Sequence, residues 1–74
     1  DIVVYNRNLV PRMIVECKNP KIKLNQKVFN QIALYNMQLK VPYLLVSNGH
    51  SSLMCTIDFE HKSYDFISVF PSFK

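Results

Sequence analysis

The chain has 74 residues, a hydrophobic fraction of 49% and a formal net charge of +4. This length allows one small domain, which we expect over residues 1–74, and the apolar content excludes a disordered segment. No run approaches the roughly 20 apolar residues of a membrane helix. The two cysteines lie outside any CxxC or Cys/His pattern, which excludes a disulfide scaffold or a zinc module. Such sparse cysteine usage favours a reducing cytoplasm.

A β-hairpin is the first predicted element. Residues 2–5 are β-branched or aromatic, and the asparagines at positions 6 and 8 tolerate turn geometry. We therefore expect a strand over residues 1–5 to pair with a second strand over residues 10–17.

The end of the second strand carries polar side chains. Because successive side chains of a strand point to opposite faces, Glu16 and Lys18 share one face, and Cys17 is expected to face the core as a small hydrophobe. Both faces of this strand are apolar until Glu16. We therefore expect a central strand that is covered on both sides and whose polar end opens into a cleft.

A helix is predicted after the break at Asn19-Pro20. Asn25 is a good N-cap residue for a helix over residues 26–39. Gln31 and Tyr35 are four positions apart and share one side of this helix, although packing alone also explains the tyrosine. The expected apolar stripe consists of Val28, Ile32, Tyr35 and Leu39, widened by Phe29 and Ala33.

Three further strands complete the predicted fold. Residues 43–47 have the pattern of a buried strand, and Asn48-Gly49 after them is the clearest turn signal in the chain. Strands over residues 52–58 and 64–70 are expected to follow. This order predicts an α+β (α/β-like) fold, in which a mixed β-sheet is joined through a crossover helix.

Asp1, Glu16 and Lys18 are expected to meet at one end of this sheet. Two crowded carboxylates repel each other unless a cation lies between them, and Mg²⁺ prefers hard oxygen ligands. A metal site beside a lysine fits this arrangement. The alternative is a hairpin-capping aspartate with a surface Glu–Lys pair worth about 0–1 kcal/mol, but the apolar residues before Glu16 favour a site at the edge of a core.

Positive charge concentrates just after the proposed metal site. The net charge of +4 and the pI of about 9.3 favour a polyanionic partner, and we expect Lys21, Lys23 and Lys27 to contact DNA. A solvated loop face is the alternative, and charge alone does not separate DNA from RNA. The large apolar share also predicts surface that a neighbouring domain or a second copy covers, as in a homodimer.

Taken together, Asp1, Glu16-Cys17-Lys18 and the Gln31…Tyr35 pair resemble the PD-(D/E)xK nuclease superfamily. More narrowly, most of the chain is similar to the N-terminal nuclease domain of type I restriction enzyme R proteins. This resemblance implies a restriction-endonuclease-like core. The proline that precedes the aspartate in this family and the family's upstream helix are not in the sequence, so we expect an N-terminally truncated domain.

The resemblance also implies a function, a Mg²⁺-dependent endonuclease acting on double-stranded DNA. Asp1, Glu16 and the backbone carbonyl of Cys17 would bind the metal, and Lys18 would act as a base or stabilise charge, two roles that the sequence leaves open. Other restriction-modification subunits or domains would be partners. The implied catalytic residues are Asp1, Glu16, Lys18, Gln31 and Tyr35, of which the last two would bind phosphate or position the lysine.

Two other functions fit the same residues. One is a non-catalytic DNA- or protein-binding module that retains the nuclease fold, and the other is a nuclease of RNA or branched DNA with the same metal chemistry. The sequence has no Walker P-loop, so any motor for ATP-driven translocation must lie in other sequence.

Overall fold

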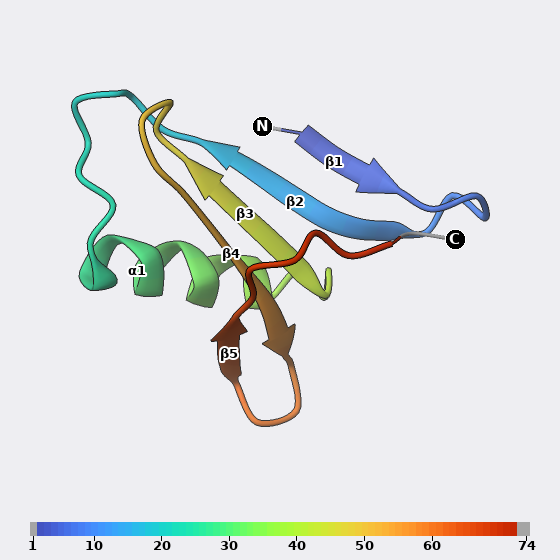
Figure 1. Ribbon diagram of the computed structural model, residues 1–74. Coiled ribbons are helices and arrows are strands. Elements are labelled where there is room, and N and C mark those ends of the chain that lie inside the picture. Colours follow the sequence, from blue (N-terminus) through green and yellow to red (C-terminus); the bar gives the residue numbers. More distant parts are fainter. Residues whose placement is uncertain (1, 73–74) are drawn as a thin grey trace.

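The computed structural model describes residues 2–72, in which five strands form one sheet beside a single helix (Figure 1). In the sheet the strands follow their sequence order, and only β2 and β3 are parallel neighbours, because the helix between them returns the chain to the same end of the sheet. The predicted α+β fold with a mixed sheet and a crossover helix is confirmed. The elements are β1 (Ile2–Tyr5), β2 (Pro11–Cys17), α1 (Gln26–Met37), β3 (Tyr43–Ser47), β4 (Ser52–Asp58) and β5 (Ser63–Phe66).

The predicted hairpin is formed by β1 and β2, which pair antiparallel. Asn6 closes the turn, because its backbone N–H donates to the Val10 carbonyl at 3.0 Å and its side-chain oxygen accepts from the Val10 N–H at 3.0 Å. Val10 therefore belongs to the turn, and β2 begins one residue later than predicted. Asp1, the predicted first residue of the first strand, lies outside the described residues.

Helix α1 begins as predicted and ends earlier. The Asn25 side chain accepts from the Val28 N–H at 2.9 Å, which confirms the N-cap, but the last helical residue is Met37. The predicted apolar stripe is wrong at two positions, because Tyr35 is 67% and Leu39 53% exposed. The buried residues of the helix are Phe29, Ile32, Ala33 and Asn36.

Aromatic packing explains why the buried side of α1 differs from the prediction. The Phe29 ring lies 5.2 Å from the ring of Tyr64 and 5.0 Å from that of Phe66, both in β5. This contact turns the helix toward β5 and brings Asn36 into the core. The asparagine is tolerated there because its amide donates to the Ile32 carbonyl at 2.9 Å, so that no buried donor is left without a partner.

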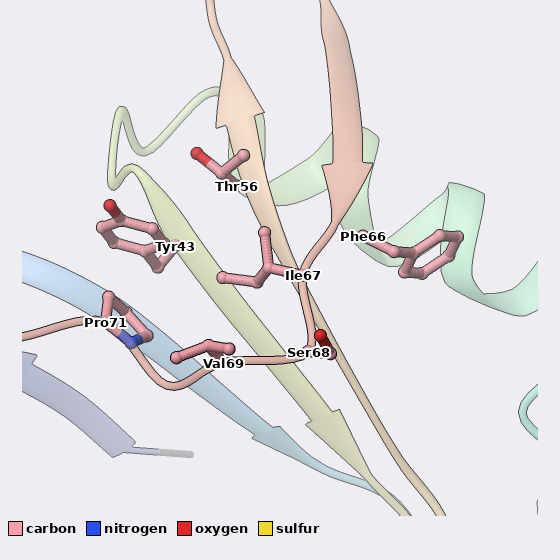
Figure 2. A pocket seen from close by; sticks show the side chains of 7 residues that line it. All are labelled: Tyr43, Thr56, Phe66, Ile67, Ser68, Val69 and Pro71. Carbon is pink, nitrogen blue, oxygen red and sulfur yellow. The ribbon is translucent and has the colours of Figure 1, made fainter.

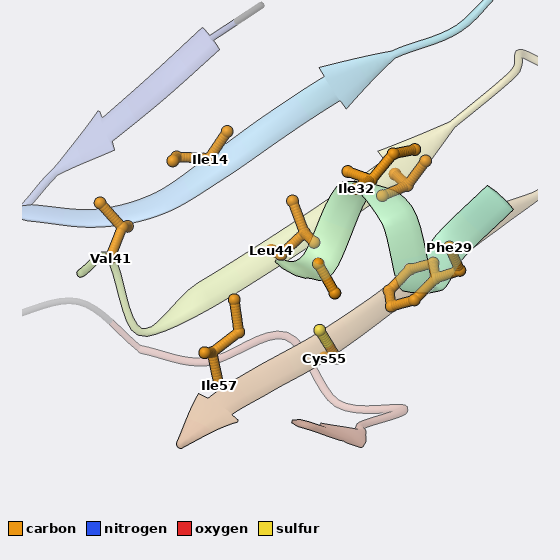
Figure 3. Close-up of a cluster of buried hydrophobic side chains, with 9 residues drawn as sticks. Ile14, Phe29, Ile32, Val41, Leu44, Cys55 and Ile57 are labelled. Carbon is orange, nitrogen blue, oxygen red and sulfur yellow. The ribbon is translucent and has the colours of Figure 1, made fainter. Parts of the chain in front are cut away.

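The core lies between α1 and one face of the sheet (Figure 3). On β2, Ile14 belongs to this core while Met13, which alternates with it, is fully buried on the opposite face. Since β2 also lies between β1 and β3, the prediction of a central strand covered on both sides is confirmed at Met13 and Ile14, whereas Cys17 at the end of the strand is exposed. The core residues contributed by the sheet are Ile14, Leu44, Val46, Cys55 and Ile57.

The last strand is shorter than predicted. The bounds of β3 and β4 match the expectation, but β5 ends at Phe66 rather than at residue 70. After it, residues 67–72 cross the sheet face opposite α1, where Ile67 and Pro71 are half-buried (Figure 2). The Ile67 N–H still donates to the Met54 carbonyl of β4 at 2.9 Å, but Pro71 has no backbone donor with which to continue strand pairing.

Between this C-terminal segment and the sheet lies a hollow of about 500 Å³ beside Tyr43 and Thr56 (Figure 2). Among the described residues no charged side chain lines it, and it lies on the face opposite α1. In the part of the chain that the structure describes, no helix is long and apolar enough to cross a membrane.

Candidate active site

Glu16 lies where β2 leaves the core. Strand alternation places it on the same face as Ile14, which packs against α1, and the sheet register pairs it with Val46 of β3, a fully buried residue. The Glu16 side chain is 15% exposed. Its carboxylate is therefore at the border between the core and solvent.

The Lys18 side chain approaches this carboxylate. Its Nζ lies 4.0 Å from Glu16 Oε2, and the Lys18 side chain is 34% exposed. At this distance the contact is electrostatic, without a direct hydrogen bond, so the carboxylate oxygens retain the capacity to accept from another ligand. The ammonium itself still reaches solvent.

The metal-binding prediction involves Asp1, which lies outside the described residues. The register pairs Ile2 with Val15, so the described start of β1 lies beside the end of β2 that carries Glu16. Within residues 2–72, no three His, Cys, Asp or Glu residues gather into a group that could hold a metal ion. The described donors are the Glu16 carboxylate and the Cys17 carbonyl, hard oxygens of the kind that Mg²⁺ prefers.

The side chain of Cys17 is exposed, which corrects the expectation that it faces the core. In the sheet Cys17 pairs with Ser47, the last residue of β3. The C-terminal segment covers the same sheet face beside Tyr43, which is the first residue of β3. The covering segment therefore does not extend over the thiol. The buried thiol is that of Cys55, and neither cysteine forms a disulfide.

Gln31 and Tyr35 are both exposed on α1. Tyr35 lies about 180° around the helix axis from Gln26, whose side-chain amide donates to the Tyr64 hydroxyl of β5. Tyr35 is therefore directed away from β5 and does not pack in the core. The charged groups of Glu16 and Lys18 lie 4.0 Å apart, whereas within residues 2–72 neither Gln31 nor Tyr35 hydrogen-bonds either of them.

Three lysines of the predicted DNA contact lie between the end of β2 and the first turn of α1. Lys21 and Lys23 are exposed in the connector, residues 18–25, and Lys27 is exposed on the helix. The connector begins at the candidate site itself, because Lys18 is its first residue. Its backbone places the charge of this segment next to the end of β2.

Asn48 is a feature of the site that sequence reasoning assigned only to a turn. The turn prediction is confirmed, since the Asn48 side-chain oxygen accepts from the N–H groups of His50 at 2.9 Å and Ser51 at 2.8 Å. Its amide nitrogen also donates to the Ile22 carbonyl in the connector at 2.7 Å. No local pattern signals that bond, because it joins residues 26 positions apart.

Comparison with known families adds one finding to this geometry. The family model described as Type I restriction enzyme R protein N terminus (HSDR_N) matches residues 1–71. No curated protein and no solved structure matches the chain. The matched range includes β2, the connector, α1 and the turn at Asn48.

Proposed function

This chain belongs to the type I restriction enzyme R protein N-terminus family, and from that membership we propose that it is a Mg²⁺-dependent endonuclease domain for double-stranded DNA. The proposed fold is a restriction-endonuclease-like core. The observation that carries the proposal is the placement of Glu16 and Lys18, whose charged groups lie 4.0 Å apart where a buried central strand reaches solvent. A carboxylate beside an ammonium at such a position offers a hard oxygen ligand for a metal ion and a positive charge for a phosphate in the same place.

Glu16, the Cys17 carbonyl and Asp1 would hold the Mg²⁺ ion. Bound there, the ion would supply Lewis acidity toward the scissile phosphate. Lys18 would act on the same phosphate, either by carrying positive charge beside it or by taking a proton from the attacking water. Its partial exposure is compatible with both roles, because the ammonium can reach a substrate at the sheet end.

Gln31 and Tyr35 would contact a phosphate of the substrate or position Lys18. The exposure of Tyr35 supports this assignment, because it removes core packing as the explanation for the tyrosine. An amide and a phenol four residues apart on a helix can bind neighbouring oxygens of one phosphate.

Lys21, Lys23 and Lys27 would contact the DNA backbone, and other subunits or domains of a restriction-modification complex would be the protein partners. Exposed apolar side chains on β1, among them Val3 and Tyr5, support burial against such a partner or against a second copy in a homodimer. The proposed compartment is the cytoplasm.

The test is duplex cleavage by the full-length natural protein. Glu16→Gln and Lys18→Met should each lower the cleavage rate by about 100-fold or more, and a chelator should stop the wild type. Glu60→Gln and Lys62→Met are matched controls, because both residues are exposed in the turn after β4, at the other end of the sheet. Those controls should cleave normally.

Melting temperatures of all four variants separate loss of chemistry from loss of folding. If folded Glu16→Gln and Lys18→Met variants cleave as fast as the wild type, the catalytic assignment is wrong. A non-catalytic DNA- or protein-binding module then becomes the better description.

A further inference from the structure

The lysine-rich connector is a folded loop with its own hydrogen bonds. Asn19 organises its first half, because its carbonyl accepts from the Ile22 N–H at 2.9 Å and its side-chain oxygen accepts from the Lys21 N–H at 2.9 Å. In the second half, the Asn25 N–H donates to the Lys23 carbonyl at 3.0 Å. A segment with two exposed lysines, Lys21 and Lys23, is thus held in tight turns beside the candidate site.

Two bonds attach this connector to the end of β3 and to the turn that follows it. The first continues the strand pairing, from the Lys18 N–H to the Ser47 carbonyl at 2.7 Å. The second is made by a side chain, from the Asn48 amide to the Ile22 carbonyl at 2.7 Å. Asn48 is only 6% exposed, so the donor end of this part-buried bond is shielded from water, although Ile22 itself is exposed.

The two ends of the Asn48 side chain hold two different loops. Its oxygen accepts from the backbone N–H groups of His50 and Ser51, which shapes the turn, while its nitrogen donates to the connector. Of the common side chains of this size, only an amide has both an acceptor and a donor in this arrangement. Aspartate would retain the turn and lose the link to the connector.

We propose that Asn48 is a positioning residue that holds the connector, and with it Lys21 and Lys23, in place beside Glu16 and Lys18. This inference rests on the proposed nuclease function and adds a determinant of substrate binding to it. A connector ordered in advance binds the phosphate backbone without first losing conformational entropy, and it aligns the bound DNA with the catalytic end of β2. Asn48 acts through the connector and does not touch the reacting atoms.

Asn48→Asp is the discriminating variant, because it keeps the acceptor for the turn and places an oxygen against the Ile22 carbonyl. Ser51→Asp is its matched control. It adds the same charge to the same turn, at an exposed residue whose backbone groups, rather than its side chain, bond Asn48. Asn48→Ser, which lacks the amide donor and adds no charge, is a second variant.

Three readouts on the full-length natural protein test the role. In Asn48→Asp, hydrogen exchange at the amides of Lys21 and Ile22 should accelerate, while Ser51→Asp should leave it unchanged. The Kd for duplex DNA should rise about fivefold beyond the value for Ser51→Asp, as expected for loss of one part-buried hydrogen bond. The single-turnover cleavage rate at saturating DNA should stay within about twofold of wild type.

Asn48→Ser should reproduce both the faster exchange and the weaker binding. Unchanged connector exchange in Asn48→Asp would refute the link, and a Kd equal to that of Ser51→Asp would refute the positioning role. A fall in the saturated cleavage rate that matches the loss of affinity would also refute it, because Asn48 would then act on chemistry or folding. If the wild type binds DNA but folded Glu16→Gln cleaves as fast as the wild type, the catalytic assignment to the end of β2 fails while the effect of Asn48 on binding remains measurable.

Discussion

The two cysteines illustrate how position decides the chemistry of a single residue. Burial and, to a smaller extent, the negative charge of Asp65 together raise the pKa of the Cys55 thiol to about 12. Cys17 is exposed at the end of β2, on the face opposite Glu16. The thiolate is the reactive form, so a thiol with such a high pKa is inert at neutral pH.

We therefore expect a neutral-pH alkylating reagent to modify Cys17 and to spare Cys55 in the folded protein. In denaturant, both thiols should react at similar rates, because burial no longer protects Cys55. Mass spectrometry of the two cysteine-containing peptides measures this, with Cys17→Ser as the control for site assignment. Equal labelling of both thiols in the native protein would contradict the buried position of Cys55.

Asp58, the last residue of β4, makes a charge-dependent turn. Its pKa is lowered, first by the hydrogen bond from the backbone N–H of His61 and then by the bond to the His61 side chain. Because the pKa is lower in the folded state, the ionised carboxylate stabilises the fold. This contribution is fully present above the ordinary pKa of 3.8 and is lost as the pH falls through the lowered pKa.

Asp58→Asn keeps an acceptor for the turn and removes the charge. We expect this variant to melt below wild type at pH values above 3.8, and the difference in melting temperature to shrink as the pH is lowered further. Glu60→Gln removes a charge from the same turn and corrects for general charge effects. A difference that stays constant throughout the acid range would argue against stabilisation by the carboxylate.

At the scale of the elements, the attachment of α1 to the sheet depends on Phe29. Its ring is fully buried and packs against Tyr64 and Phe66, which themselves lie 5.6 Å apart, so helix and last strand share one aromatic cluster. Tyr35 is an aromatic residue of the same helix on its exposed side. The two residues therefore provide a direct comparison of buried and exposed positions.

Phe29→Ala should lower the free energy of unfolding by about 3–5 kcal/mol, which is close to the whole stability of a domain of this size. We expect its cooperative urea transition to move to very low denaturant or to disappear. Tyr35→Ala should shift the free energy of unfolding by no more than about 0.5 kcal/mol. If the two substitutions destabilise the fold equally, α1 does not bury Phe29 and expose Tyr35 as the structure shows.

At the scale of the whole molecule, the distribution of charge matters more than the net charge of +4. Lys21 and Lys23 follow the candidate site, whereas Lys40 and Lys62 flank an apolar pocket between the end of α1 and the turn after β4. If DNA lies along the end of the sheet that carries Glu16 and Lys18, only Lys21 and Lys23 contact phosphates. The two pairs then differ in their effect on salt dependence.

The double variant Lys21→Ala/Lys23→Ala should bind duplex DNA more weakly, and the slope of log K against log salt should become shallower by about 2. Lys40→Ala/Lys62→Ala removes the same charge from the other end of the sheet and should leave the slope close to wild type. Binding titrations at several salt concentrations measure both. Equal slopes for the two double variants would show that the DNA does not lie along the end of the sheet beside Lys21 and Lys23.

The sequence by itself determined those features that depend on a few neighbouring residues. The bounds of β3 and β4, the Asn25 cap and the turn at Asn48-Gly49 follow from local backbone preferences and side-chain bonds to nearby N–H groups. Strand alternation likewise predicted that Glu16 and Lys18 share a face, and their charged groups do approach each other. The catalytic role of this pair remains a prediction.

Only the tertiary structure decided which sides of these elements are covered. Tyr35 and Leu39 fit the helical period just as closely as the residues that α1 buries. The contact of Phe29 with β5 decided which side of the helix is buried. The exposure of Cys17 depends on the path of the C-terminal segment, and the bond from Asn48 to the connector joins distant parts of the chain. Local preferences act over a few residues, whereas these outcomes depend on contacts summed over the whole fold, which no short window of sequence contains.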